Sequence, residues 1–193
     1  DWKTYGASAK FSRPLYVHSL LNFFFQRFDT VLVIFMLGLP TGGVYEMIKN
    51  FPKLLSRSLG ALRVPFLPHI SEQISEGDSA GASCLVNRAL ILTAFVGNVV
   101  VLGTVLTQEW LITLLLNAEY LEGTAVLGLL MGAICLAVQA GLLGETLIAL
   151  GRPLVVTVAN LGMAGITIAV SATLLRPLGI QGAGIGWLCG VSF

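Results

Sequence analysis

A stripe of polar side chains follows one face of a predicted helix at residues 44–67. At about 100° per residue, five polar positions share this face: Glu46, Lys49, Asn50, Lys53 and Arg57. Apolar residues such as Ile48 and Leu55 cover the rest of the helix. A charge at the centre of a bilayer costs roughly 2.5–3.5 kcal/mol, so a membrane helix must turn such a stripe toward protein or a water-filled cavity.

The preceding apolar segment, predicted as a helix over residues 14–38, carries an acidic residue at a matching depth. The composition of residues 40–43, Pro-Thr-Gly-Gly, predicts a tight turn, so the two helices form an antiparallel hairpin. Counted from this turn at 1.5 Å per residue, Asp29 lies about as deep as Lys49 and Lys53. We therefore expect a buried ion pair between Asp29 and one of these two lysines.

The charges of this hairpin do not cancel. Two acids, Asp29 and Glu46, face four basic residues, which are Arg27, Lys49, Lys53 and Arg57. The positive excess favours a cavity that binds an anion, with Arg27 as the weaker candidate because it lies on the opposite face from Asp29. The alternative is an ion network that only holds the helices together, in which Glu46 contacts Lys49 or Asn50. Glu145, on a later predicted helix, either bonds to a helix neighbour or takes part in coupling.

Composition indicates an integral membrane protein. Hydrophobic residues make up 55% of the 193 positions and charged residues 11%, and the mean hydropathy is +0.86. The net charge of +1, without a basic run, gives no case for nucleic-acid binding. Cysteines and histidines lack ligand spacing, and a nucleophile elbow is missing, so we expect neither a metal nor a cofactor nor an enzyme. The Gly182-x-Gly184-x-Gly186 run is interpreted as helix packing.

The apolar segments predict an all-α bundle of about six helices, which form one domain over residues 1–193. The expected helices are residues 14–38, 44–67, 89–107, 124–150, 154–175 and 180–193, the last of them truncated. Residues 69–87 are the one sizeable polar stretch, interpreted as a loop that leads into a short helix before Arg88. If residues 44–67 cross the membrane, most basic residues outside the stripe lie on one side, which the positive-inside rule assigns to the cytoplasm. We expect a multi-pass protein of the inner (plasma) membrane with a cytoplasmic N-terminus.

Several short motifs resemble a known family. They are Arg27-Phe-Asp29, Pro40-Thr-Gly-Gly-Val-Tyr45, Pro65-Phe-Leu-Pro68-His-Ile-Ser71-Glu72, Asn117-Ala-Glu-Tyr120 and Leu178-Gly-Ile-Gln-Gly-Ala-Gly184. With these motifs the chain resembles one lobe of a Wzx-type polysaccharide flippase, in the multidrug/oligosaccharidyl-lipid/polysaccharide (MOP) exporter superfamily. The resemblance implies two lobes around a central cavity that move a lipid-linked oligosaccharide to the outer leaflet, for cell-surface glycans such as lipopolysaccharide. The expected partners are this glycan lipid, the bilayer and an opposing lobe.

On this interpretation Lys49, Lys53 and Arg57 attract the pyrophosphate of a polyprenyl-linked glycan. Two other functions stay open. A drug or cation antiporter of the same superfamily would use Asp29 and Glu46 to carry protons or sodium, although its expected signature is an acidic excess. A non-transporting membrane subunit would use the charges only for helix packing.

Overall fold

The computed structural model describes residues 27–60, 63–116 and 118–193, and regular structure in these ranges is entirely helical. The first described helix covers residues 27–37. It is followed by α2 (Leu39–Gly60), α3 (Arg63–Ser75), α4 (Ser79–Leu115), a 3-10 helix η1 (Ala118–Gly123), α5 (Thr124–Ala149), α6 (Pro153–Leu178) and α7 (Ile180–Ser192). The predicted all-α fold class is confirmed.

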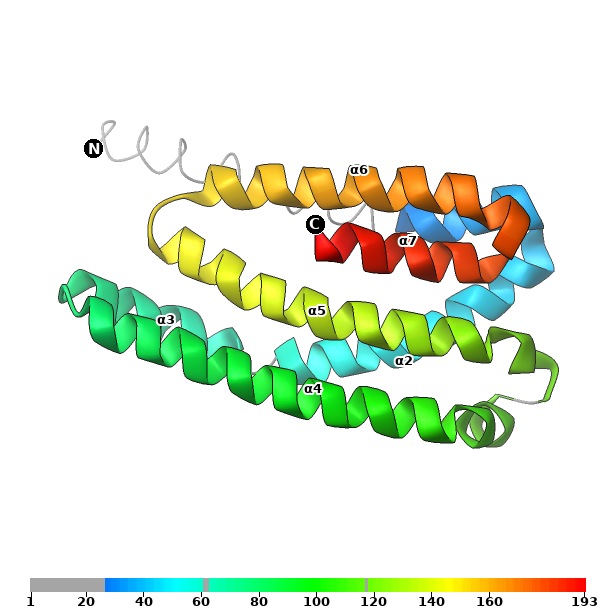
Figure 1. Ribbon diagram of the computed structural model, residues 1–193, viewed down its shortest axis with the longest axis horizontal. Coiled ribbons are helices and arrows are strands. Elements are labelled where there is room, and N and C mark those ends of the chain that lie inside the picture. Colours follow the sequence, from blue (N-terminus) through cyan, green and yellow to red (C-terminus); the bar gives the residue numbers. More distant parts are fainter. Residues whose placement is uncertain (1–26, 61–62, 117) are drawn as a thin grey trace, which may run out of the picture.

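Three long helices, α4, α5 and α6, run roughly along the same direction in an up-and-down order (Figure 1). Among the described residues, these are the helices long and apolar enough to cross a membrane. Helix α2, which carries four charged side chains, is not one of them, but it packs along α5 within the same bundle. The protein is therefore a helical membrane bundle.

Helix α5 is the centre of this bundle. In its most apolar 18-residue window 44% of the residues are buried, compared with 11% for α4 and 17% for α6. Leu127 and Met131 pack with Ile48 and Leu55 of α2 in one apolar cluster. The mostly exposed apolar surface of α4 suits contact with lipid rather than with protein. Helix α2 is thus held against the best-buried helix.

Helix α7 packs closely on α6 through glycines spaced four residues apart. A Cβ atom on Gly182 would meet the backbone of Leu174, and one on Gly186 would meet Ser171. Small residues at such positions let two helices approach until their backbones are in contact. The interpretation of the glycine run as helix packing is confirmed.

The predicted turn at residues 40–43 is wrong, because the chain reverses at Gly38. This glycine has a φ of +93°, a conformation that other residues adopt only with strain. Pro40 lies in the first turn of α2, where a helix needs no backbone N–H donor. Gly42 then allows close contact with Ile34 of the preceding helix. The predicted start of this helix at Val44 is therefore five residues too late.

The predicted end of that helix at Leu67 is also wrong. Helix α2 continues through Pro52 as far as Gly60, and α3 covers Arg63–Ser75, so helical structure extends past Leu67. Pro65 lies in the first turn of α3, so it marks the start of a helix rather than the end of one.

The segment 69–87, predicted as a loop with a short helix before Arg88, is helical except at a short turn. Gly77 has a φ of +78°, and the Asp78 side chain accepts a hydrogen bond from the backbone N–H of Gly81 at 2.9 Å, which caps the start of α4. Phe66 and Ile70 of α3 bury against Leu142 of α5. This apolar face stabilises a helix in a stretch whose composition is polar.

Other predicted bounds also differ. Helix α4 extends beyond the expected residues 89–107 at both ends, and α6 includes Arg176 and Pro177, which were expected in a turn. The reversal there occurs at Gly179, where φ is +59°. The first half of the predicted helix at residues 14–38 lies outside the described residues.

Candidate functional site

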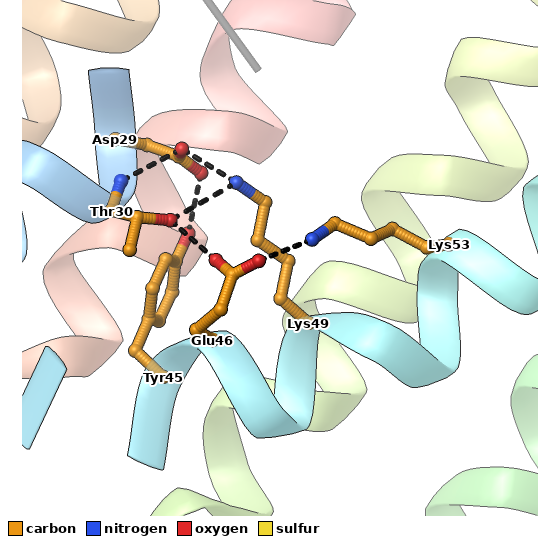
Figure 2. A network of polar contacts seen from close by, with 6 residues as sticks. All are labelled: Asp29, Thr30, Tyr45, Glu46, Lys49 and Lys53. Atoms are coloured by element: carbon orange, nitrogen blue, oxygen red, sulfur yellow. Dashed lines mark hydrogen bonds and ion pairs between the residues drawn. The ribbon is translucent and has the colours of Figure 1, made fainter. Parts of the chain in front are cut away.

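The helix of residues 27–37 and α2 bring six polar side chains together in one network (Figure 2). Because the chain reverses at Gly38, polar side chains of the two helices meet, as the contacts of residues 29 and 30 with residues 45, 46 and 49 show. The network consists of Asp29, Thr30, Tyr45, Glu46, Lys49 and Lys53. Two ion pairs form its centre, and they differ in how far they are buried.

The first ion pair is buried. Lys49 Nζ lies 2.6 Å from Asp29 Oδ1, and these side chains are only 6% and 4% exposed. The Asp29 carboxylate also accepts hydrogen bonds from Tyr45 Oη at 2.9 Å and from the backbone N–H of Thr30 at 2.8 Å. A buried charge is tolerated when it is paired and its remaining lone pairs are bonded, and both conditions hold here. Lys49, rather than Lys53, is the partner of Asp29.

The second ion pair is half-exposed. Lys53 Nζ lies 2.5 Å from Glu46 Oε1, with side chains 37% and 34% exposed. Thr30 Oγ1 donates a hydrogen bond of 2.7 Å to the other carboxylate oxygen of Glu46. Glu46 was expected to contact Lys49 or Asn50, one turn away, yet it reaches Lys53 two turns away. The reason is that Asp29 already takes the Lys49 ammonium.

Thr30 connects the two pairs. Its hydroxyl donates to Glu46 and also accepts from Lys49 Nζ at 3.4 Å, a longer contact. The two lysines and two carboxylates balance in charge. A neutral, connected network of this kind fixes the position of α2 relative to the preceding helix.

Two members of the network, Thr30 and Tyr45, were not singled out from the sequence. Tyr45 precedes Lys49 by four residues and therefore shares its face of α2, with Lys49 Nζ 5.8 Å from the centre of the tyrosine ring. Tyr45 is fully buried. Two features of the sequence could have indicated these residues. The Tyr45 hydroxyl lies one helical turn from the Lys49 charge, and Thr30 directly follows Asp29.

The remaining predicted site residues lie outside this network or at its edge. Asn50 and Arg57 are exposed on α2, and Arg27 is exposed at the start of the described chain. Glu145 is half-buried in α5 between Leu142 and Ala149, which pack in the cluster formed with α3 and α4. The positive excess expected from the sequence is therefore carried by exposed arginines, while both lysines are paired with acids.

A small cavity lies behind the two lysines, between α2, α5 and α7. It has a volume of about 30 Å³ and is lined by Lys49, Pro52, Lys53, Leu130, Ile134 and Trp187. This is space for one water molecule and too little for a phosphate or a sugar. A larger ligand must approach Lys53 from its exposed side, where Asn50 and Arg57 lie.

The described residues contain no group of three His, Cys, Asp or Glu side chains that could hold a metal ion.

These features define the class of protein. An apolar helical bundle with candidate membrane spans and a charged network between two of its helices favours a transporter-type membrane protein over an enzyme.

Comparison with known families gives a more specific result. The model of a family described as polysaccharide biosynthesis protein matches residues 1–125, and the chain belongs to this family. The match supports the resemblance to a lobe of a Wzx-type flippase and indicates a role in polysaccharide biosynthesis. Comparison with curated proteins and with solved structures gives no match.

Proposed function

We propose that the protein is one lobe of a transporter that moves a lipid-linked oligosaccharide from the inner to the outer leaflet. The family match supports a role in polysaccharide biosynthesis, and the long apolar helices support a membrane location. The glycans of such pathways are built on polyprenyl carriers through a pyrophosphate, as the resemblance implies. The substrate therefore combines an apolar tail, an anionic link and a polar glycan.

The observation that carries this proposal is the accessible cationic face of α2. Lys53 is 37% exposed, and Arg57, one turn further along the same face, is exposed. Asn50, also exposed, adds an amide that can donate to phosphate oxygens. Charge-assisted hydrogen bonds of this type are stronger than neutral ones, and arginine matches phosphate geometry with two donors. Lys53, Arg57 and Asn50 are thus the proposed pyrophosphate site, and Arg27, on the opposite face of its helix from Asp29, is left out of it.

Lys49 has a different proposed role from the one expected of it. Its ammonium is buried against Asp29, so it positions α2 and does not itself reach a ligand in this conformation. An opposing lobe is proposed to face α2 and to close the cavity around the substrate. For coupling to an ion we propose Glu46, which is about one-third exposed and paired with Lys53, and Glu145, which is half-buried in α5.

The proposed orientation follows from the ends of the bundle. The turns at Gly77 and Gly151 lie at one end of the bundle, while η1, which contains no basic residue, and the last turn of α6 with Arg176 lie at the other (Figure 1). Arg152 directly follows Gly151, and Arg88 lies in the third turn of α4 from the Gly77 end. Basic residues favour the cytoplasmic side. We therefore place the turns at Gly77 and Gly151, and the N-terminus, in the cytoplasm of a cell whose inner membrane holds the protein.

Depletion of the full-length protein in its own cells tests this function. The proposal expects lipid-linked oligosaccharide to accumulate on the cytoplasmic leaflet and surface polysaccharide to fall. The antiporter alternative expects greater sensitivity to cationic drugs with unchanged glycan lipids. It has less support here, because each carboxylate of the network is paired with a lysine. If the protein is a non-transporting subunit, its depletion should change neither the glycan lipids nor the drug sensitivity, apart from effects that follow from loss of the complex to which it belongs.

A further inference from the structure

Lys53, the central residue of the proposed pyrophosphate site, already has an anion bound to it. That anion is the carboxylate of Glu46, 2.5 Å from the lysine ammonium. The same carboxylate is held in place by Thr30 Oγ1 at 2.7 Å. Glu46 therefore occupies the position that a phosphate oxygen would take on Lys53.

The two ion pairs of the network are suited to different roles. The Asp29–Lys49 pair is almost fully buried, and breaking it would leave a buried charge without its ion-pair partner. The Glu46–Lys53 pair is about one-third exposed, and such pairs are weak because water competes with them. A ligand can thus exchange with Glu46 on Lys53 while Asp29 and Lys49 keep the two helices in place.

Glu46 also has a partner that remains after such an exchange. Its Oε2 atom bonds to Thr30, whereas its Oε1 atom bonds to Lys53, so loss of the lysine leaves one hydrogen bond intact. The displaced carboxylate is on the accessible side of α2 and can regain water. These contacts make the exchange possible without burying an unpaired charge.

We propose that Glu46 is an internal competitor that holds Lys53 in the empty transporter and is displaced by the pyrophosphate of the substrate. This inference rests on the proposed function and describes how the proposed pyrophosphate site selects its ligand. Competition with a carboxylate favours groups with more than one negative charge, because these can engage Lys53 and Arg57 together. A lipid with a pyrophosphate then binds better than one with a neutral head group.

The test uses the full-length protein in phosphatidylcholine nanodiscs, with farnesyl pyrophosphate as the probe and farnesol as the uncharged control. Dissociation constants are measured for wild type, Glu46→Gln, Glu46→Asp and Lys53→Gln, and for Glu72→Gln as a matched control. Glu72 is an exposed acid of α3 whose carboxylate lies 3.9 Å from His69. Inorganic pyrophosphate, measured in parallel, separates recognition of the anion from recognition of the lipid.

We expect Glu46→Gln to bind farnesyl pyrophosphate about two- to fivefold more tightly than wild type, the effect of removing a competing half-exposed ion pair. Glu46→Asp, whose shorter side chain cannot span two turns to Lys53, should also bind more tightly, but less so because its charge remains. Farnesol binding and the Glu72→Gln variant should be unchanged. If the lipid is required, inorganic pyrophosphate should bind every variant much more weakly, with the variants in the same order of affinity.

Two results contradict different parts of the account. Unchanged or weaker binding by both Glu46 variants, with a loss of at least about tenfold in Lys53→Gln, overturns the competitor role and leaves the proposed site intact. Wild-type affinity in Lys53→Gln overturns the proposed site itself, whatever the Glu46 variants do. Should Glu46→Gln fail to insert, Glu46→Asp decides the competitor role alone.

Discussion

The ammonium of Lys49 lies 2.6 Å from the carboxylate of Asp29, and both side chains are almost fully buried between two helices of an apolar bundle. Tyr45 and the backbone of Thr30 complete the hydrogen bonds of the aspartate. This pair connects α2 to the helix before it. Together with the packing of α2 on α5, it positions the exposed residues of α2, including Lys53 and Arg57.

The first prediction concerns the stability of this pair. Asp29→Asn should destabilise the protein by about 3–5 kcal/mol, because it leaves the Lys49 charge buried without its carboxylate. The double change Asp29→Asn with Lys49→Met should recover much of the loss, since it removes the stranded charge. Unfolding of the purified protein in a mild detergent measures both effects.

The matched control for this experiment is the double change Asp29→Asn with Lys53→Met. Lys53 is paired with Glu46 and not with Asp29, so its removal should recover nothing. Equal recovery by the two double variants would show that the buried pair is not specific to Lys49.

The second prediction concerns the contact between α6 and α7. Gly186→Ala should destabilise the bundle by about 1–3 kcal/mol, because the added methyl group would meet Ser171 and the α6 backbone. Gly165→Ala is the control, since a Cβ there meets nothing within 4 Å and alanine is the better helix former. Thermal unfolding of the two variants in parallel checks the difference, and similar midpoints would argue against close packing at Gly186.

The third prediction concerns topology. In a variant without its native cysteines, a single cysteine at Thr41 should react with a membrane-impermeant reagent added to intact cells. A single cysteine at Ser79 should react only after the membrane is opened, because it lies at the opposite end of the bundle (Figure 1). Labelling of position 79 but not of position 41 from outside would invert the proposed orientation.

The sequence predicted those features that depend on helical periodicity. The five-residue polar stripe of α2 and the depth match of Asp29 follow from 100° and 1.5 Å per residue, and they led to the expected ion pair. Which lysine would pair was left open, because two lysines one turn apart have nearly the same depth. The choice of Lys49 depends on the rotation of the helices about their axes, which packing of Ile48 and Leu55 on α5 determines.

The boundaries of the helices could be predicted less well. Proline and glycine break helices in general, but Pro40, Pro52 and Pro68 all lie inside helices of this protein. The reversal instead uses Gly38, whose backbone has a positive φ. Likewise, the polar composition of residues 69–87 concealed an apolar face that becomes evident only when Ile70 and Leu142 are seen in contact.

The central claim, that the accessible cations of α2 bind the anionic link of the substrate, is tested most directly by flipping of a fluorescent lipid-linked oligosaccharide. The full-length protein is reconstituted into vesicles, and the rate is expressed per inserted protein. Lys53→Gln and Arg57→Gln should each slow flipping about tenfold or more, since a charge-assisted hydrogen bond contributes about 1.5–3 kcal/mol. Lys53→Arg should keep part of the rate because a cation remains.

The control in this assay is Arg176→Gln, which removes an exposed charge from the last turn of α6 and should leave the rate unchanged. Abundance and unfolding temperature of every variant must match wild type, so that a slower rate reports ligand binding and not lost protein. The account predicts slow flipping in both α2 variants and a normal rate in Arg176→Gln. Wild-type rates in Lys53→Gln and Arg57→Gln would contradict it and would leave the network with a structural role alone.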